Sequence, residues 1–209
     1  MGRPREHSEQ TRAALRAAAE RLVAEGGPAA LSVRAVAREA GTTTRAVYSL
    51  FGSKEALLVD ALARDAFEFL YEENDALPET DDPVADLIAV GVSTFRRLVL
   101  EHPAAYRIAF QRVVPSLDPG PELTEARSRA WSQLQAKVRR LEEADLLGGR
   151  SVQEAAVVFN AMLEGLANAE LRGSVFRNLP EGDEATAWHD SFSTVIAGFA
   201  TGKRQQHPY

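Results

Sequence analysis

Apolar residues recur at helical spacing along almost the entire chain, and this periodicity limits the fold more than any other feature. In residues 9–25, the apolar positions i, i+3, i+4, i+7 and i+8 are Leu15, Ala18, Ala19, Leu22 and Val23, which would form one stripe on a helix. No segment shows the strict alternation of apolar and polar residues that is typical of a half-buried strand. The pattern therefore predicts an all-α protein of about nine helices.

The composition is that of a folded protein without thiol chemistry. Of the 209 residues, 45% are hydrophobic and 26% are charged, which are ordinary values for a globular domain. There is no cysteine, so the chain offers no disulfide, thiolate zinc site or thiol nucleophile. Apolar runs stay far below the ~20 residues of a membrane span. Arginines and glutamates interrupt the apolar stretches near the N-terminus, unlike a signal peptide. We therefore expect a cytoplasmic protein that does not bind a membrane.

The charge of the chain is unevenly distributed. Its net charge is 24 − 30 = −6, which by itself argues against nucleic acid as a partner. Residues 1–54, however, contain nine basic and five acidic residues, a net of +4, whereas residues 55–209 carry a net of −10. Such an asymmetry suggests an interaction module joined to a second part, although chance distribution is the alternative.

Residues 32–50 have the pattern of a helix-turn-helix. Ser32 can cap a short helix whose inner face is Val33, Val36, Ala37 and Ala40, and Gly41 suits the turn that follows. In the next short helix Ala46 and Val47 would face inward, while the outer positions hold hydroxyl groups, a guanidinium and a phenol. These groups can bond to bases and phosphates. The segment is therefore a candidate DNA reader, with a compact helical hairpin as the alternative.

The residues after the turn make the resemblance specific. The string from Gly41 to Leu58, GTTTRAVYSLFGSKEALL, resembles the N-terminal signature of TetR-family transcriptional regulators: a glycine turn, a Tyr, then a Phe, a Lys-Glu pair and a Leu pair. Leu50 stands where many members have an aromatic residue or His. The resemblance implies a helix-turn-helix DNA-binding domain over residues 1–55, a connecting helix over 53–75, and a helical effector-binding and dimerisation domain over 76–209. The acidic stretch 68–82, ending near Pro83, is expected to be a loop between helices.

The resemblance also assigns roles to residues of the N-terminal part. Arg45 is the best candidate for reading a base, and Lys54, next to the Ser53 cap, for holding a phosphate. Phe51 and Leu57 resemble the residues that hold the fourth helix against the module. The full set of expected DNA contacts is Ser32, Arg34, Thr43, Thr44, Arg45, Tyr48, Ser49 and Lys54.

The C-terminal part resembles, more loosely, a subgroup with a Trp-His-Gly-type helix, in which Glu164-Gly165 stands for the His-Gly pair and the Trp is missing. Small residues recur every four positions at Ala161, Gly165, Ala169 and Gly173, which would let another helix approach closely. We interpret this small-residue seam, together with the stripe Trp188–Phe199, as the dimer face. An intramolecular helix contact is the alternative for the seam. Asn160, Glu164 and Asn168 form a polar stripe that is either a solvated face or a set of anchors in an apolar pocket. The candidate pocket residues are Phe95, Phe110, Trp131, Phe159, Met162 and Glu164, although large apolar residues at helical spacing are also typical of an ordinary core.

These features together predict a sequence-specific DNA-binding regulator. We expect a homodimer that binds a pseudo-palindromic double-stranded operator and is released from it, as a repressor, by a small-molecule effector. A helical interaction protein that does not bind DNA is the alternative. Enzyme activity is disfavoured because the four histidines are scattered and no phosphate loop or nucleophile elbow is present, and the sequence suggests neither a metal site nor a cofactor.

Overall fold

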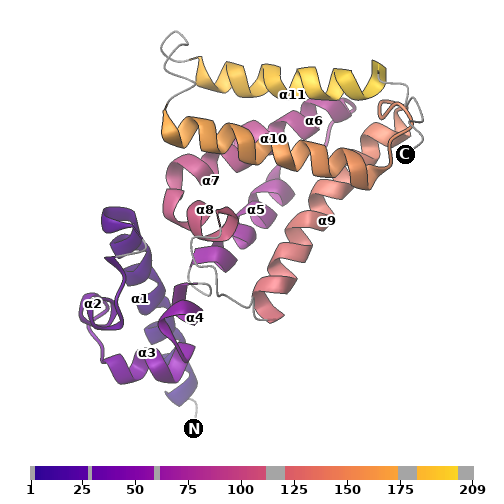
Figure 1. Cartoon of the computed structure of the whole chain (residues 1–209). Helices are drawn as coiled ribbons and strands as arrows, with labels where there is room; N and C mark the ends of the chain where they lie inside the picture. The colour runs from indigo at the N-terminus through magenta and orange to yellow at the C-terminus, as the bar shows by residue number, and fades with distance from the viewer. Residues whose placement is uncertain (1–2, 28–29, 59–61, 112–120, 174–182, 202–209) are drawn as a thin grey trace, which may run out of the picture. The chain divides into compact units, whose positions relative to one another are not determined.

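The computed structural model describes residues 3–27, 30–58, 62–111, 121–173 and 183–201 (Figure 1). Within these ranges every regular element is helical and no strand occurs, which confirms the all-α prediction. No described helix combines the length and apolar character that crossing a membrane requires. The chain packs as two compact units. The N-terminal unit comprises Met1–Phe69 and Glu101–Ser128, and the C-terminal unit comprises Leu70–Leu100 and Arg129–Tyr209.

The N-terminal unit is built around α1 (Arg3–Gly26). Four residues of its predicted apolar stripe are buried and Leu22 is half-buried. Three short helices follow: α2 (Val33–Glu39), α3 (Thr44–Phe51) and α4 (Lys54–Leu58). Each of the three packs against α1, and so does α8 (Pro103–Phe110). The long helix α9 (Pro121–Glu143) begins in this unit. A long central helix thus supports a set of short ones.

The predicted connecting helix corresponds to α4 and α5 (Arg64–Ala76), and residues 59–61 lie outside the described ranges. The expectation that the whole acidic stretch 68–82 is a loop is wrong, because α5 continues to Ala76. Its acids are tolerated in a helix because Glu72 and Asp75 face solvent, while Leu70 and Asn74 face inward. The predicted domain boundaries do not follow the two packed units and remain a prediction.

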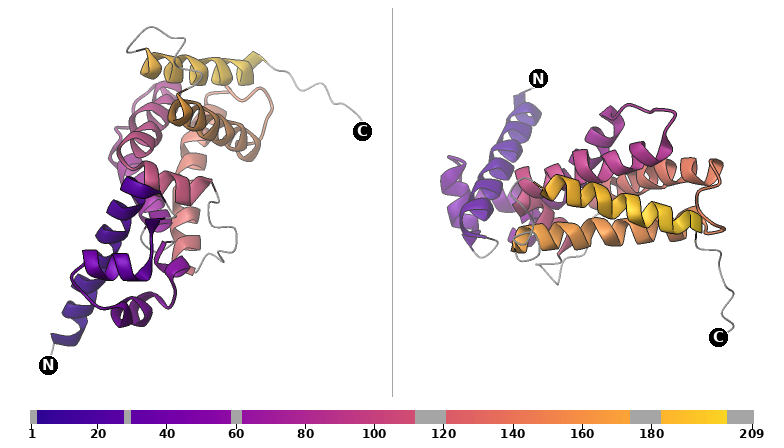
Figure 2. Two further views of the ribbon diagram at one scale, coloured as in Figure 1. Left: turned by 60° about the vertical axis from the view of Figure 1, so that its left-hand side comes forward. Right: turned by 90° about the horizontal axis from the view of Figure 1, so that it is seen from above.

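The C-terminal unit contains the helix that begins at Pro83. It runs as α6 (Pro83–Ala89), the π-helical segment η3 (Val90–Phe95) and α7 (Arg96–Glu101). Helices α10 (Val152–Arg172) and α11 (Glu184–Thr201) lie side by side (Figure 2), and α11 also packs on α6 and η3. The predicted capping box of α10 is present: Ser151 Oγ accepts from the Glu154 N–H, and the Glu154 carboxylate accepts from the Ser151 N–H.

The core of the C-terminal unit contains the aromatic residues of α11. The rings of Phe159 and Phe192 stack with centroids 4.7 Å apart, and Trp188 meets Phe192 edge-on at 5.9 Å. Trp188, Phe192, Ile196 and Phe199 are all buried within the protomer. The prediction that this stripe forms the dimer face is therefore wrong for these four residues, because α11 turns them toward α6, η3 and α10.

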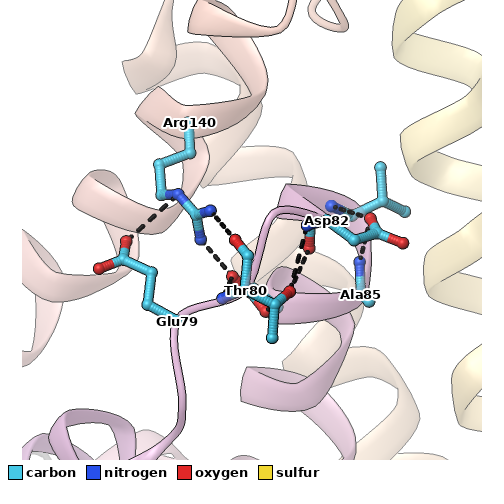
Figure 3. Close-up of polar contacts among 7 residues, drawn as sticks. Glu79, Thr80, Asp82, Ala85 and Arg140 are labelled. Atoms are coloured by element: carbon cyan, nitrogen blue, oxygen red, sulfur yellow. Dashed lines mark hydrogen bonds and ion pairs between the residues drawn. The ribbon is translucent and has the colours of Figure 1, made fainter.

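A polar cluster joins the start of α6 to α9 (Figure 3). The buried Asp86 carboxylate accepts hydrogen bonds from the Thr80 N–H at 2.9 Å, from the Thr80 hydroxyl at 2.7 Å, and from Arg140. Arg140 also contacts Glu79 at 3.2 Å and donates to the Thr80 carbonyl. Burial alone would raise the pKa of Asp86, but these hydrogen bonds and the guanidinium charge outweigh it, so its pKa is lowered.

Replacing Asp86 with asparagine is expected to destabilise the fold by about 1 kcal/mol at neutral pH, because the charge-assisted bonds to Arg140 and Thr80 weaken. Since the folded-state pKa is lowered, the advantage of the wild type is present above the ordinary aspartate pKa. It disappears as the pH falls through the lowered value. Urea unfolding of both proteins across acidic and neutral pH measures this difference. The exposed Asp81→Asn is the matched control and should change little. A pH-independent difference between wild type and D86N would contradict the expectation.

Candidate functional site

Helix α2 begins where the sequence predicts. Ser32 has extended backbone angles, and its Oγ accepts a hydrogen bond from the Ala35 N–H at 3.1 Å, which satisfies one of the unpaired donors of the first turn. Val36 and Ala37 are buried, and Arg34 is exposed. The start of α2 therefore presents a guanidinium and a capped helix end on the surface of the N-terminal unit.

The turn between α2 and α3 requires its glycine. Gly41 has φ of 65°, in the left-handed region. Its N–H donates to the Arg38 carbonyl at 3.2 Å, and the Thr42 N–H donates to the Ala37 carbonyl at 2.8 Å. These two bonds are the Schellman arrangement that ends a helix and redirects the chain. The turn thereby fixes where α3 starts relative to α2.

Helix α3 presents the predicted reading residues on its outer face. Val47 is fully buried and Phe51 nearly so, which leaves Thr44, Arg45, Tyr48 and Ser49 exposed. The Tyr48 side chain is 56% exposed, so its ring and hydroxyl are open to solvent. Thr43 is the N-cap, and its Oγ1 accepts from the Ala46 N–H at 3.2 Å, so its hydroxyl hydrogen remains to be donated.

Helix α4 starts directly at Lys54, and the preceding Ser53 caps it through a hydrogen bond from the Ala56 N–H at 3.0 Å. Leu57 is fully buried, as predicted. The sequence did not reveal the role of Arg12 on α1. Its guanidinium donates to the Leu50 carbonyl at 2.8 Å and lies 4.7 Å from the centroid of the Phe51 ring. Arg12 thus anchors the end of α3. Its position three residues before Leu15, on the apolar side of α1, was the available signal.

The six predicted pocket residues are distributed over the two packed units, and their role as a pocket remains a prediction. Phe110 belongs to the N-terminal unit, where its ring stacks on Tyr106 at 5.4 Å. Phe95 and Phe159 are buried core residues of the C-terminal unit, and Trp131 and Met162 are half-buried there. Of the polar stripe, Asn160 donates to the Glu164 carboxylate and Asn168 to the Glu164 carbonyl, both at 2.8 Å. The stripe is half-buried and internally bonded.

The capped α2, the glycine turn and the exposed hydroxyl and guanidinium groups of α3 together define a helix-turn-helix protein. Comparison with known families agrees. Residues 15–61 match the family described as "Bacterial regulatory proteins, tetR family", and residues 87–195 match the "Tetracyclin repressor-like, C-terminal domain". The chain belongs to the TetR family, whose members are transcriptional regulators and not enzymes. The resemblance to the Trp-His-Gly-type subgroup remains a prediction.

Individual relatives support the same assignment. The HTH-type transcriptional regulator Rv1816 of Mycobacterium tuberculosis is 31% identical over 128 residues, which are 59% of this chain and 53% of that protein. The chain thus aligns with about half the length of the curated relatives it matches. Among solved structures, a Rhodococcus sp. RHA1 protein of unknown function is 24% identical, with a TM-score of 0.75 over 91% of this chain and 96% of that one. Bacillus subtilis FadR in complex with stearoyl-CoA is 16% identical, with a TM-score of 0.71 over 89% and 98%. Both structures share the fold.

Proposed function

We propose that this chain is a sequence-specific DNA-binding regulator that represses transcription in the cytoplasm until a small-molecule effector releases it. The observation that carries the proposal is the outer face of α3, where Thr44, Arg45, Tyr48 and Ser49 are all exposed while Val47 is buried. A guanidinium can donate in fork fashion to guanine, and hydroxyl groups can bond to bases or phosphates in the major groove. Ser32, Arg34 and Lys54 would contact the phosphate backbone and set the position of α3.

We propose that the active form is a homodimer. The support lies on α10, where Val157 and Val158 are 52% and 43% exposed and Ala161 is also exposed. A Cβ added to Gly165 would meet no other atom within 4 Å, so another helix could approach closely here. Two copies would present two α3 helices to half-sites about 10 bp or a multiple of this apart on a pseudo-palindromic operator.

Release by an effector requires that the ligand binds one conformation of the dimer better than the other. Such a ligand shifts the population and lowers operator affinity by its differential binding free energy. We assign DNA binding to residues 1–55, connection to the helix within 53–75, and effector binding with dimerisation to residues 76–209. FadR, which has the same fold, is seen with a bound acyl-CoA, so this fold accommodates a small molecule.

A gel-shift experiment tests the proposal. The full chain is titrated into DNA from upstream of the neighbouring gene and into a shuffled sequence, at two salt concentrations. We expect a shift that prefers the upstream DNA and weakens with salt, because phosphate contacts release counterions. Absence of any salt-sensitive, sequence-preferring shift would favour the alternative, a helical interaction protein that does not bind DNA.

Replacing Lys54 with alanine is expected to weaken binding to all DNA sequences alike and to reduce the slope of log affinity against log salt by about one. The reason is that a lysine at the start of α4 would neutralise a phosphate without reading a base. Binding isotherms at several salt concentrations, on upstream and shuffled DNA, measure both quantities. Lys137→Ala in α9 removes the same charge from the C-terminal unit and should leave the slope unchanged. Equal slopes for K54A and wild type would refute the phosphate contact.

A further inference from the structure

Four side chains of the C-terminal unit contain a buried nitrogen or oxygen atom with no hydrogen-bond partner among the described residues. The atoms are Asn74 Oδ1 on α5, Thr94 Oγ1 in η3, Gln133 Oε1 on α9 and the indole Nε1 of Trp188 on α11, and the first three can accept a hydrogen bond. Thr94 is fully buried and Asn74 is 7% exposed. Leaving a buried polar group unpaired costs about 1–3 kcal/mol. Such groups are rare in native proteins and call for an explanation such as a ligand or ordered water.

The Thr94 hydroxyl is fully buried and differs from four other helical hydroxyl groups among the described residues. The hydroxyls of Ser128, Ser191, Ser193 and Thr201 each donate to the carbonyl four residues earlier, at 2.7–3.2 Å. Thr94 instead lies in the π-helical segment η3, where the Arg96 N–H donates to the Gly91 carbonyl five residues earlier. Single π-helical turns within α-helices are frequent at functional sites. The altered turn therefore leaves the Thr94 hydroxyl available to another molecule.

Helices α5 and α9 run in the same direction in the C-terminal unit. The Arg129 guanidinium lies 4.9 Å from the centroid of the Tyr71 ring. Further along both segments, Arg140 contacts Glu79 at 3.2 Å. The later residue of one segment, Glu79, thus meets the later residue of the other, Arg140. Residues that follow Tyr71 therefore lie beside residues that follow Arg129.

Asn74 and Gln133 consequently lie at about the same height along the axes of α5 and α9, and this height defines one level of the unit. Asn74 is three residues after Tyr71, and Gln133 is four residues after Arg129, which corresponds to about 4.5 Å and about 6 Å along the helix axes. Residues three or four apart share a helix face. Asn74 is thus on the face of α5 that meets α9, and Gln133 is on the face of α9 that meets α5.

Thr94 reaches the same level from the third helix. The helix α6–η3–α7 runs opposite to α5. Its residue Arg97 pairs with Glu73 at 2.6 Å, whereas its earlier residue Asp86 pairs with Arg140, which contacts the later residue Glu79. Because the two helices run in opposite directions, the step back from Arg97 to Thr94 and the step forward from Glu73 to Asn74 lead the same way along the axes. Thr94 therefore lies on the Asn74 side of the Arg97–Glu73 pair. Three helices thus bring three unpaired polar atoms to one level of the unit.

Three arginines around this level, Arg96, Arg97 and Arg140, are paired with carboxylates. Arg96 forms a bidentate pair with Glu170 at 2.6 Å, and both side chains are largely buried. Arg97 and Arg140 are paired with carboxylates as well. The charges of these three arginines are therefore balanced by carboxylates and do not favour an anionic ligand. The unpaired atoms of Asn74, Thr94 and Gln133 are two amide oxygens and one hydroxyl, which favour a ligand that donates N–H or O–H hydrogen bonds at this level.

We propose that Asn74, Thr94 and Gln133 form the polar recognition group of the effector site, and that the effector is a neutral compound with an apolar body and an alcohol or amide group. This inference rests on the proposed function for the existence of an effector. It adds the residues that recognise the effector and the chemical class of ligand, and it excludes an acyl-CoA or a free carboxylate as the preferred ligand.

The first test measures the stability of the full chain without ligand or DNA. Thr94→Val and Asn74→Leu are expected each to raise Tm by about 2–4 °C, because an unpaired polar atom is replaced by an apolar group of similar size. Thr201→Val is the matched control, since its hydroxyl is exposed and already bonded to the Ala197 carbonyl. It should not raise Tm. A purely structural role for Thr94 or Asn74, or satisfaction by ordered water alone, would make T94V and N74L lower Tm and would overturn the proposal.

The second test measures ligand-induced Tm shifts with named probes. The probes are 1-decanol, decanamide and decanoate, the naphthalene compounds 2-naphthol, 2-naphthamide and 2-naphthoate, and stearoyl-CoA. We expect at least one neutral compound to raise the Tm of the wild type above its matched carboxylate, and this shift to be lost in T94V and N74L but kept in T201V. A larger shift from a carboxylate or stearoyl-CoA, persistence of the shift in T94V and N74L, or no shift from any neutral probe would overturn the ligand class. These measurements need no DNA, so failure of DNA binding is detected separately by the gel shift.

Discussion

Replacing Arg45 with alanine is expected to weaken binding to the operator by about 1–3 kcal/mol and to relax the preference at the base pair that Arg45 reads. Arg45 is exposed near the start of α3, beside Thr44 and one turn from Tyr48 and Ser49. Its planar guanidinium can donate two parallel hydrogen bonds to O6 and N7 of guanine, which distinguishes this base from the others. Losing such a bidentate contact removes both affinity and specificity.

The matched control for this change is Arg38→Ala. Arg38 is also exposed, but it lies in the last turn of α2, outside the reading face. Titration of wild type, R45A and R38A on the operator and on single-base variants separates base reading from charge. We expect R38A to keep the base preference and Arg45→Lys to lose most of it, because lysine lacks the planar fork. If R45A retained both affinity and preference, Arg45 would not be a base-reading residue.

The helix-turn-helix could be predicted from the sequence because its structure depends on local chemistry. Ser32 and Thr43 cap their helices by hydrogen bonds to residues three positions later, and Gly41 adopts the positive φ that its turn needs. Val47 is buried as its spacing requires. Each of these features involves neighbours in the chain, which are visible in a linear sequence.

Contacts between distant residues were not predictable in the same way. Helical spacing shows which side of a helix is apolar, but not which helix covers it. Arg140 finds Asp86, 54 residues away, and Arg12 finds the carbonyl of Leu50, 38 residues away. The stripe from Trp188 to Phe199 was recognised correctly as apolar, yet it was assigned to a dimer face. The packing partners of α11 within the protomer decide that it is core.

Gly91 is the position in η3 that admits the ring of Phe192. A Cβ added to Gly91 would meet Cδ2 of Phe192 at 2.8 Å and would lie nearer still to two other ring atoms. The ring cannot easily move away, because it is fully buried and packs against Phe159 and Trp188. Gly91→Ala is therefore expected to destabilise the fold by about 1–3 kcal/mol through overpacking.

The sign of this effect should depend on Phe192. Phe192→Ala is expected to cost about 3–5 kcal/mol, because it leaves a cavity among buried rings. Once the ring is absent, however, Gly91→Ala should become neutral or stabilising, since alanine is favoured over glycine in a helix by up to about 1 kcal/mol. Urea unfolding of the two single variants and the double variant, at one protomer concentration, measures this coupling. Gly198→Ala in α11 is the control: a Cβ there would be in open space, so this substitution should not destabilise the fold. Additive free-energy changes for G91A and F192A would show that the ring is not what requires glycine at this position.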